Sequence, residues 1–209
     1  MDKSKKVKEI LIRLYKLYPQ SSTALVYQTP FQLLVATIMS AQTTDSTVNK
    51  ITPELFKKYP DAKAFASAKV EEIASSINKV NFFNNKAKYI KAMSEILVSK
   101  FGGEVPKDMD GLAALPGVAR KTANVVLGQA YGIASGIAVD THVIRLSQKL
   151  GLTVQKHPVK IEKDLMEIVP KENWIDWTNL LINYGREYCP ARKHDESNCP
   201  LGDLYVKAV

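Results

Sequence analysis

The sequence predicts an all-α protein, and three observations lead to this prediction. Apolar residues recur at helical spacing along almost the whole chain, as in Val7, Ile10, Leu11 and Leu14. Strand patterns are scarce, since the best of them, residues 137–139, is too short to pair into a sheet and is better explained as a buried connector. The composition, with 45% hydrophobic and 24% charged residues, is that of a globular protein with a real core.

Each helix can be justified from its own stretch of sequence. The first contains the apolar stripe from Val7 to Tyr18, and the second begins where Thr29 offers a capping oxygen and Pro30 suits the first helical position. Because residues 31–39 are mostly apolar, we expect this second helix to be buried. The other predicted helices, mostly separated by Gly or Pro, cover about 46–59, 70–77, 85–101, 110–115, 120–131, 141–150, 159–168 and 176–188.

Length, charge and cysteine content limit the classes of function. A chain of 209 residues permits one large domain or two small ones, and its formal net charge of +8 attracts polyanions such as nucleic acid, an anionic membrane face or an acidic protein. The N-terminus carries no signal-peptide core, and residues 31–39 are too few to span a bilayer, so we expect no membrane association. Cys189 and Cys199 make no disulfide framework and fit a reducing cytoplasm.

Residues 115–127 carry the strongest functional signal. They follow a short predicted helix and open a longer one, which predicts a helix, a Pro-Gly turn and a second helix. Backbone N–H groups between Pro116 and Ala119, including those of Gly117 and Val118, would face outward at the positive end of the second helix and form a cradle for phosphate. On this short match alone, an ordinary helical hairpin that uses Pro and Gly as turn residues is favoured.

A longer match to a family pattern favours the functional interpretation over the ordinary hairpin. Together with residues 139–142, the segment resembles the helix-hairpin-helix of DNA glycosylases, specifically the endonuclease III family, and further blocks of the family pattern stand in order at residues 40–45, 84–87 and 184–193. The resemblance covers nearly the whole chain. It implies two all-helical lobes, with double-stranded DNA across the cleft: a six-helix barrel over 22–133 and a second domain formed by 1–21 and 134–209.

The resemblance also implies an activity, because family members excise damaged pyrimidines and then cleave the strand. We therefore expect a monomeric, bifunctional DNA glycosylase and AP lyase that removes oxidised pyrimidines in base excision repair, located in the cytoplasm and associated with the nucleoid. Two alternatives remain. A non-catalytic DNA-binding module would need only the hairpin, and a mismatch or adenine glycosylase would release the base without cutting the strand.

Lys121 and Asp140 are the expected catalytic residues. An ammonium in the first turn of a helix beside Arg120 meets the helix dipole and a like charge, both of which favour the neutral, nucleophilic amine. By the resemblance, Lys121 attacks C1′ of the damaged nucleotide and forms a Schiff base, while Asp140 stabilises the oxocarbenium-like sugar and helps take the amine's proton. Taken singly, a solvated lysine and a helix N-cap would explain the two positions. His142 is left out of the catalytic set.

An enzyme that flips a nucleotide out of the duplex must fill the vacated space. By the resemblance, Gln42 is the inserted glutamine and Phe82 the apolar intercalating residue, whereas Phe83 is expected in the core. Asn81 stands where the family usually has glycine, and we expect it to adopt a positive φ. Ala119 replaces a second family glycine, which lowers the expected phosphate affinity slightly. The full set of expected DNA-binding residues is Gln42, Asp45, Phe82, Pro116, Gly117, Val118, Ala119 and Arg120.

Many members of the family close the chain with four cysteines that hold a [4Fe–4S] cluster. When the first of these is aligned on Cys189, the other three positions are Glu196, Cys199 and Tyr205. Two thiolates are too few for the cluster, and carboxylate and phenol oxygens are hard substitutes for sulfur, so we expect no cluster and no metal. Two alternatives are less favoured than a C-terminal segment without metal. One is a zinc ion held by the two cysteines, His194 and a nearby acid, and the other is a disulfide between the cysteines.

Overall fold

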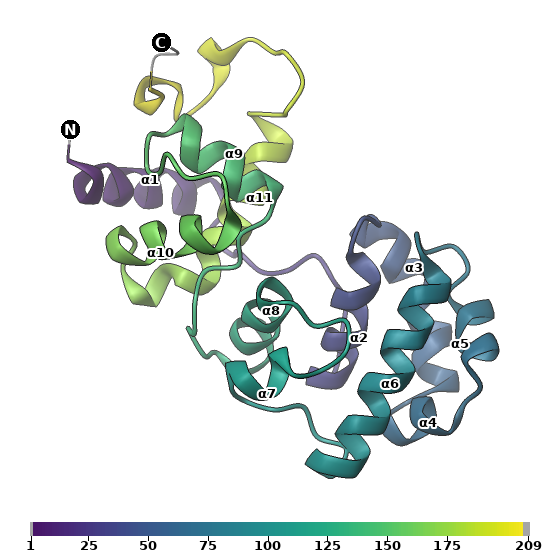
Figure 1. Cartoon of the computed structure of the whole chain (residues 1–209). Coiled ribbons are helices and arrows are strands. Elements are labelled where there is room, and N and C mark those ends of the chain that lie inside the picture. Colours follow the sequence, from purple (N-terminus) through teal and green to yellow (C-terminus); the bar gives the residue numbers. More distant parts are fainter. Residues whose placement is uncertain (1, 207–209) are drawn as a thin grey trace. The chain divides into compact units, whose positions relative to one another are not determined.

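The structure, a computed structural model, describes residues 2–206 and is all-helical, with no strand among those residues (Figure 1). The predicted fold class is confirmed. The chain divides into two compact units, of which one runs from Thr23 to Ser135 and the other joins both chain ends, up to Ser22 and from Gly136 onward. The sequence-based expectation put these boundaries near residues 22 and 133.

The 23–135 unit is built around α2 (Pro30–Ser40). Thr29 begins this helix by accepting the N–H of Gln32 with its hydroxyl oxygen, and Pro30 takes the first helical position. Residues 31–39 are all buried, as expected from their composition. They are buried because α2 packs against α3 (Asp45–Lys58), α6 (Phe83–Phe101) and α8 (Arg120–Tyr131).

Three short helices complete this unit, namely α4 (Ala62–Ser67), α5 (Val70–Ser76) and α7 (Met109–Ala113). The first two lie against the long α6, while α7 pairs with α8 (Figure 1). Helix α4 is absent from the helices predicted from the sequence, because it is too short to show a periodic stripe. It forms because Asp61 caps it and because Phe65 is fully buried against two other aromatic rings.

The unit formed by both chain ends centres on α11 (Trp174–Glu187), whose Trp177 and Tyr184 are fully buried. The connector over residues 137–139 is buried and contains no strand, as expected. In the part of the chain that the structure describes, no helix has the length and apolar character needed to cross a membrane. The other helices of this unit are α1 (Lys3–Leu17), α9 (Thr141–Lys149) and α10 (Pro158–Ile168), with 3-10 turns η1 (Lys171–Asn173), η2 (Glu196–Asn198) and η3 (Gly202–Leu204).

Candidate DNA interface, catalytic residues and cysteine group

Two exposed residues with left-handed backbone lie on neighbouring loops of the 23–135 unit. Gln42, between α2 and α3, has φ 55°, and Phe82, directly before α6, has φ 58°. No other non-glycine residue among those described has a positive φ. Phe82 also leaves 63% of its surface exposed, which is unusual for so large an apolar side chain. Backbone strain of this kind is characteristic of functional sites.

The positive φ at Phe82 corrects the expectation that Asn81 would adopt it. Asn81 is held by hydrogen bonds to the other loop, because its backbone N–H donates to Thr43 Oγ1 at 3.1 Å and its side-chain amide donates to the Gln42 carbonyl. These bonds join the two loops that carry Gln42 and Phe82. Phe83 is half-buried and packs against the core of the unit, so the two adjacent rings have different surroundings.

Lys86 also binds the loop that carries Gln42. Its side chain is buried, and its ammonium donates to the carbonyls of Met39 at 2.7 Å and Ala41 at 2.5 Å. Burial lowers the pKa of this ammonium to about 8, because the charged form loses its hydration. Lys86 is not among the functional residues predicted from the sequence, although it lies within one of the family blocks, residues 84–87.

The hairpin between α7 and α8 has the predicted turn. Gly117 has φ 77°, and a Cβ added there would lie 2.8 Å from Tyr89 Cβ, so the turn requires glycine both for backbone conformation and for space. The expected phosphate cradle is smaller than predicted, because Val118 is buried and its N–H donates to the Leu115 carbonyl at 3.1 Å within the turn. The other expected cradle residues are Pro116, which is partly buried, and Gly117, Ala119 and Arg120, which are exposed.

Lys121 lies in the first turn of α8, and its side chain is exposed. Ala119 occupies the N-cap position and supplies no side-chain hydrogen bond there. A helix N-terminus without a capping oxygen keeps backbone donors and partial positive charge directed at whatever anion approaches it. The amine of Lys121 and the guanidinium of Arg120 thus lie at a helix end that favours a phosphate.

Asp140 begins α9 in the unit formed by both chain ends, whereas Lys121 belongs to the 23–135 unit. Its carboxylate accepts the N–H of Val143 at 2.9 Å, so it acts as the helix N-cap, and it is partly exposed. Asp45 is the first residue of α3, directly after the N-cap Thr44, where the helix dipole favours a carboxylate. Both acids therefore have a structural reason for their positions in addition to the expected functional one.

The surroundings of His142 favour its neutral form. Burial lowers the pKa of its imidazole, and the charges of Arg145 and Arg186 lower it further, while Asp140 opposes them. Its Nδ1 is buried and has no hydrogen-bond partner among the residues that the structure describes. The residue as a whole is half-buried, and its omission from the catalytic set stays a prediction.

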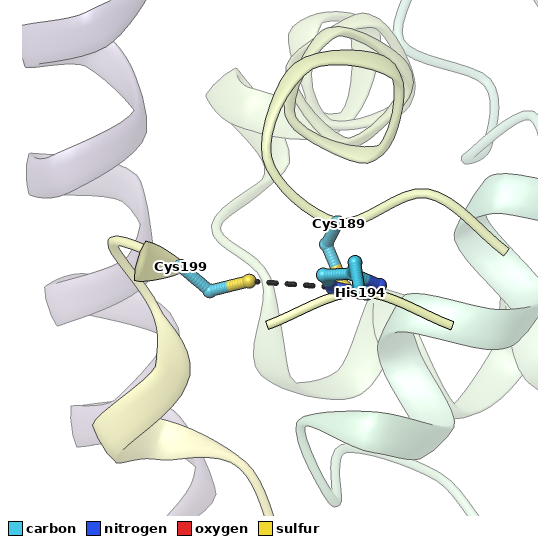
Figure 2. Close-up of side chains that lie close together, drawn as sticks. All are labelled: Cys189, His194 and Cys199. Atoms are coloured by element: carbon cyan, nitrogen blue, oxygen red, sulfur yellow. Dashed lines mark hydrogen bonds between the residues drawn. The ribbon is translucent and has the colours of Figure 1, made fainter. Parts of the chain in front are cut away.

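Two cysteines and a histidine meet near the C-terminus (Figure 2). Cys189 follows α11, His194 lies in the next loop, and Cys199 follows η2. One ligand atom of each lies within 4.8 Å of the other two, and both thiols are buried and free of a disulfide. The expectation that this end binds no metal is therefore not confirmed, because thiolates and imidazole are ligands of transition metals.

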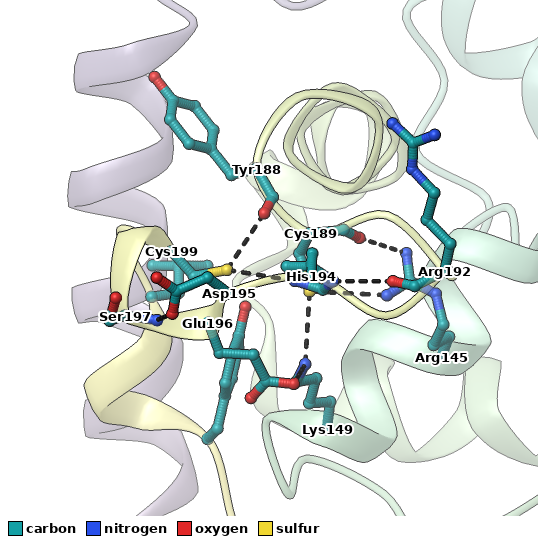
Figure 3. A network of polar contacts seen from close by, with 12 residues as sticks. Arg145, Lys149, Tyr188, Cys189, Arg192, His194, Asp195, Glu196, Ser197 and Cys199 are labelled. Carbon is teal, nitrogen blue, oxygen red and sulfur yellow. Dashed lines mark hydrogen bonds and ion pairs between the residues drawn. The ribbon is translucent and has the colours of Figure 1, made fainter.

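Charged and polar groups surround Cys189 (Figure 3). Its Sγ lies 3.6 Å from Arg145 Nη1 and 3.6 Å from Lys149 Nζ, both of which come from α9. Burial opposes ionisation of this thiol, but hydrogen bonds from Tyr205 and Arg145 and the charge of Lys149 outweigh it and lower the pKa of Cys189.

The side chains at the other two cluster positions carry oxygen atoms, and each makes a further polar contact. Glu196 Oε1 lies 2.5 Å from Lys149 Nζ, and the Tyr205 hydroxyl lies 2.6 Å from the hydroxyl of Tyr184. Neither oxygen is a soft ligand, and a [4Fe–4S] cluster is held by four thiolates. The residues present do not fit that cluster.

Comparison with known proteins agrees with this combination of fold and hairpin. Residues 35–171 match the family described as HhH-GPD superfamily base excision DNA repair protein. Endonuclease III of Synechocystis sp. is 52% identical, over 99% of this chain and 94% of its own, and endonuclease III of Escherichia coli K12 is 40% identical, over 98% and 96%. The solved structure of a trapped endonuclease III–DNA covalent intermediate superposes with a TM-score of 0.92, at 40% identity, over 98% of this chain and 96% of its own.

The fold and the hairpin thus define a base excision DNA repair protein of the helix-hairpin-helix class. A thermostable thymine-DNA glycosylase, at 22% identity and a TM-score of 0.85, shares the fold. The chain belongs to the endonuclease III family of DNA glycosylases and AP lyases.

Proposed function

We propose that this protein, as a monomer bound to the DNA of the cytoplasmic nucleoid, removes oxidised pyrimidines from double-stranded DNA and then cleaves the strand by β-elimination. The observation that carries the proposal is the exposed Lys121 in the first turn of α8, directly after the hairpin turn. A relative with 40% identity forms a covalent intermediate with DNA, and such an intermediate requires a nucleophile on the protein. Lys121 is a group of that kind at a helix end that favours phosphate.

Lys121 acts as the nucleophile through its neutral amine. The amine forms a bond to C1′ of the damaged nucleotide, and the bond from C1′ to the base breaks, so that the base leaves with the electron pair and takes up a proton. The sugar then opens to an imine, loss of a C2′ proton expels the 3′ phosphate, and water releases the lysine. The carboxylate of Asp140 stabilises the positive charge on the sugar and accepts the proton that the attached nitrogen loses.

The exposed residues of the 23–135 unit hold the substrate. Gln42 and Phe82 fill the space that the flipped nucleotide vacates. This role explains why both residues, on loops joined by hydrogen bonds, have a left-handed backbone conformation. Gly117, Ala119 and Arg120 hold the phosphate backbone beside the lesion, and Asp45 fixes the start of the helix that follows Gln42.

Borohydride trapping tests this mechanism. Borohydride added during turnover on a duplex with one oxidised pyrimidine should reduce the imine and leave the protein covalently bound to DNA. Lys121→Gln should abolish both trapping and nicking, whereas Lys63→Gln, which changes an exposed lysine in the first turn of α4, should retain both. Nicking by Lys121→Gln at the wild-type rate would contradict the proposal, and base release without nicking by the wild type would indicate a monofunctional glycosylase.

Asp140→Asn tests the carboxylate separately from the helix cap. Asparagine caps helices about as well as aspartate, so the start of α9 should be preserved while the charge is removed. Base release should slow by about 10²–10³, the typical effect of removing one electrostatic stabiliser. Asp140→Ala serves as the comparison, since it removes both the charge and the cap and should lower the melting temperature as well. Unchanged base release in Asp140→Asn would remove this residue from the mechanism.

A further inference from the structure

The geometry points to a mononuclear zinc site formed by Cys189, His194 and Cys199. Burial, proximity and ligand chemistry come together at these three side chains and reverse the sequence-based preference for a metal-free end. The site is distinct from a [4Fe–4S] centre, because it uses two sulfurs and one ring nitrogen and needs neither Glu196 nor Tyr205.

The distances fit one tetrahedral ion. Zinc–sulfur bonds of about 2.3 Å and zinc–nitrogen bonds of about 2.0–2.1 Å place sulfur and nitrogen about 3.5 Å apart around a tetrahedral centre. Cys199 Sγ lies 3.5 Å from His194 Nε2, and the ligand atoms of all three residues lie within 4.8 Å of one another (Figure 2). Around such an ion the two sulfurs would lie about 3.8 Å apart, so from the 4.8 Å limit they need to approach each other by at most about 1 Å.

The tautomer of His194 is the one that a metal needs. Its Nδ1 lies 2.9 Å from the carbonyl of Arg192, a contact that requires the proton on Nδ1. The lone pair therefore lies on Nε2, the nitrogen that faces Cys199 Sγ. Metal-bound histidines usually have their second nitrogen fixed by such a carbonyl or carboxylate, and this ring is already oriented in that way.

The surrounding charges suit bound thiolates. Arg145 and Lys149 each place a nitrogen 3.6 Å from Cys189 Sγ and can donate to sulfur (Figure 3). Two thiolates neutralise one Zn²⁺, so the bound group has no net charge for these cations to repel. Binding releases two thiol protons to solvent, and one of them is the proton that Cys199 shares with the Tyr188 carbonyl at 3.1 Å.

The donor set selects the type of ion. Soft sulfur with imidazole favours zinc over magnesium and calcium, which prefer oxygen ligands. Three protein ligands leave the fourth position to water. When bound, the ion would close the loop over residues 189–199, which otherwise depends on packing and on the ion pair between Lys149 and Glu196.

Metal binding by the full-length chain tests this site without DNA. Protein kept under a thiol reductant and stripped by a chelator is dialysed against buffered Zn²⁺, and elemental analysis should then find about one zinc per chain. His194→Asn and Cys199→Ser should bind zinc at least about tenfold more weakly. His157→Asn changes an exposed histidine outside the group and should bind zinc like the wild type.

Two further measurements report on the ligands. Co²⁺ in place of Zn²⁺ should give the strong visible absorption of a tetrahedral thiolate site. Zn²⁺ should raise the melting temperature of the wild type but not of His194→Asn.

Each contrary result overturns the zinc site. These results are no bound zinc, equal zinc binding by His194→Asn and the wild type, or a cobalt spectrum without thiolate bands. About four irons per chain in the purified protein would overturn both this site and the absence of a [4Fe–4S] cluster. Because His194 is only partly buried, its variant should fold, and circular dichroism checks that it does. None of these measurements involves Lys121, so their failure would leave the proposed reaction standing.

Discussion

Lys86 shows how one buried charge can set the shape of a functional loop. Its ammonium lies between the carbonyls of Met39 and Ala41, directly before Gln42, in a region where a buried carbonyl without a partner is costly. A pattern does exist in the sequence, because Lys86, Ile90 and Met93 share one face of a helix and the last two are fully buried. A lysine on an apolar face is the available signal, and its partners come from residues more than forty positions away, which no local pattern reveals.

The titration of Lys86 should be visible in the stability of the protein. Its pKa is about 8 in the folded state against 10.5 for the ordinary group, so the unfolded chain binds more protons between these two values. The stability of the wild type relative to Lys86→Met should therefore rise with pH between about 8 and 10.5, by up to about 1.4 kcal/mol per pH unit. Urea unfolding of both proteins across this range measures the difference. If the difference in unfolding free energy between the two proteins were constant or fell with pH, burial would not destabilise the charged form of Lys86.

Phe82 and Phe83 should respond differently to truncation. Phe82→Ala removes an exposed ring from a strained backbone position, so it should leave the melting temperature nearly unchanged while weakening binding to DNA with an abasic site. Phe83→Ala removes a half-buried ring from the core and should lower the free energy of unfolding by about 1–2 kcal/mol. Fluorescence anisotropy and thermal denaturation measure the two effects, and the reverse ranking would exchange the two assignments.

The same pair of positions shows where residue-level prediction fails. Asn81 is the better residue for a left-handed backbone by intrinsic preference, yet Phe82 has that conformation. Three-dimensional contacts outweigh the preference, because Asn81 makes two hydrogen bonds to the loop of Gln42 and Thr43. The sequence could identify the turn and its exposed ring but not which residue would be strained.

Among the helices, the sequence predicts the start best where a capping residue or proline marks it. Thr29 and Pro30 mark the start of α2, and Asp140 marks the start of α9. The side chains of Thr29 and Asp140 cap these helices as expected. The helix α4 was missed because six residues are too few for periodicity, and its stability depends on ring contacts made by Phe65. Short helices of this kind follow from packing more than from their own sequence.

The hairpin turn between α7 and α8 should be sensitive to the loss of its glycine. Gly117→Ala should lower the free energy of unfolding by about 1–2 kcal/mol for the left-handed backbone, and by a further amount for contact with Tyr89. It should also weaken binding to abasic DNA. Gly132→Ala is the matched control, since Gly132 has φ 66° and no atom within 4 Å of an added Cβ. Urea unfolding and anisotropy should show the larger loss at Gly117, and equal losses would remove the special role of this turn.

At the scale of the whole molecule, the sequence predicted an all-helical fold, but it gave no firm account of the C-terminal end. The cysteine count leaves two thiolates at this end, and the other two cluster positions carry the oxygens of Glu196 and Tyr205. The number of cysteines could not show that the loop between Cys189 and Cys199 folds back and brings His194 beside both thiols. That proximity depends on the packing of the loop after α11, which has no periodic signature.

The net charge of +8 should act on DNA affinity through direct contacts between basic side chains and phosphates. Affinity for abasic duplex, measured with Lys121→Gln to prevent turnover, should fall linearly with salt on logarithmic axes, with a slope near −0.9 for each phosphate neutralised. A fourfold rise in salt then costs about tenfold in affinity for every two phosphates contacted. Arg120→Ala in the same background should reduce the slope by about one phosphate, whereas Lys63→Gln, away from the hairpin, should leave it unchanged. A flat salt profile would mean that the charge serves only solubility and that the hairpin binds DNA by other contacts. Equal effects of the two substitutions would mean that phosphates are bound by the overall field of the protein and not by the N-terminus of α8.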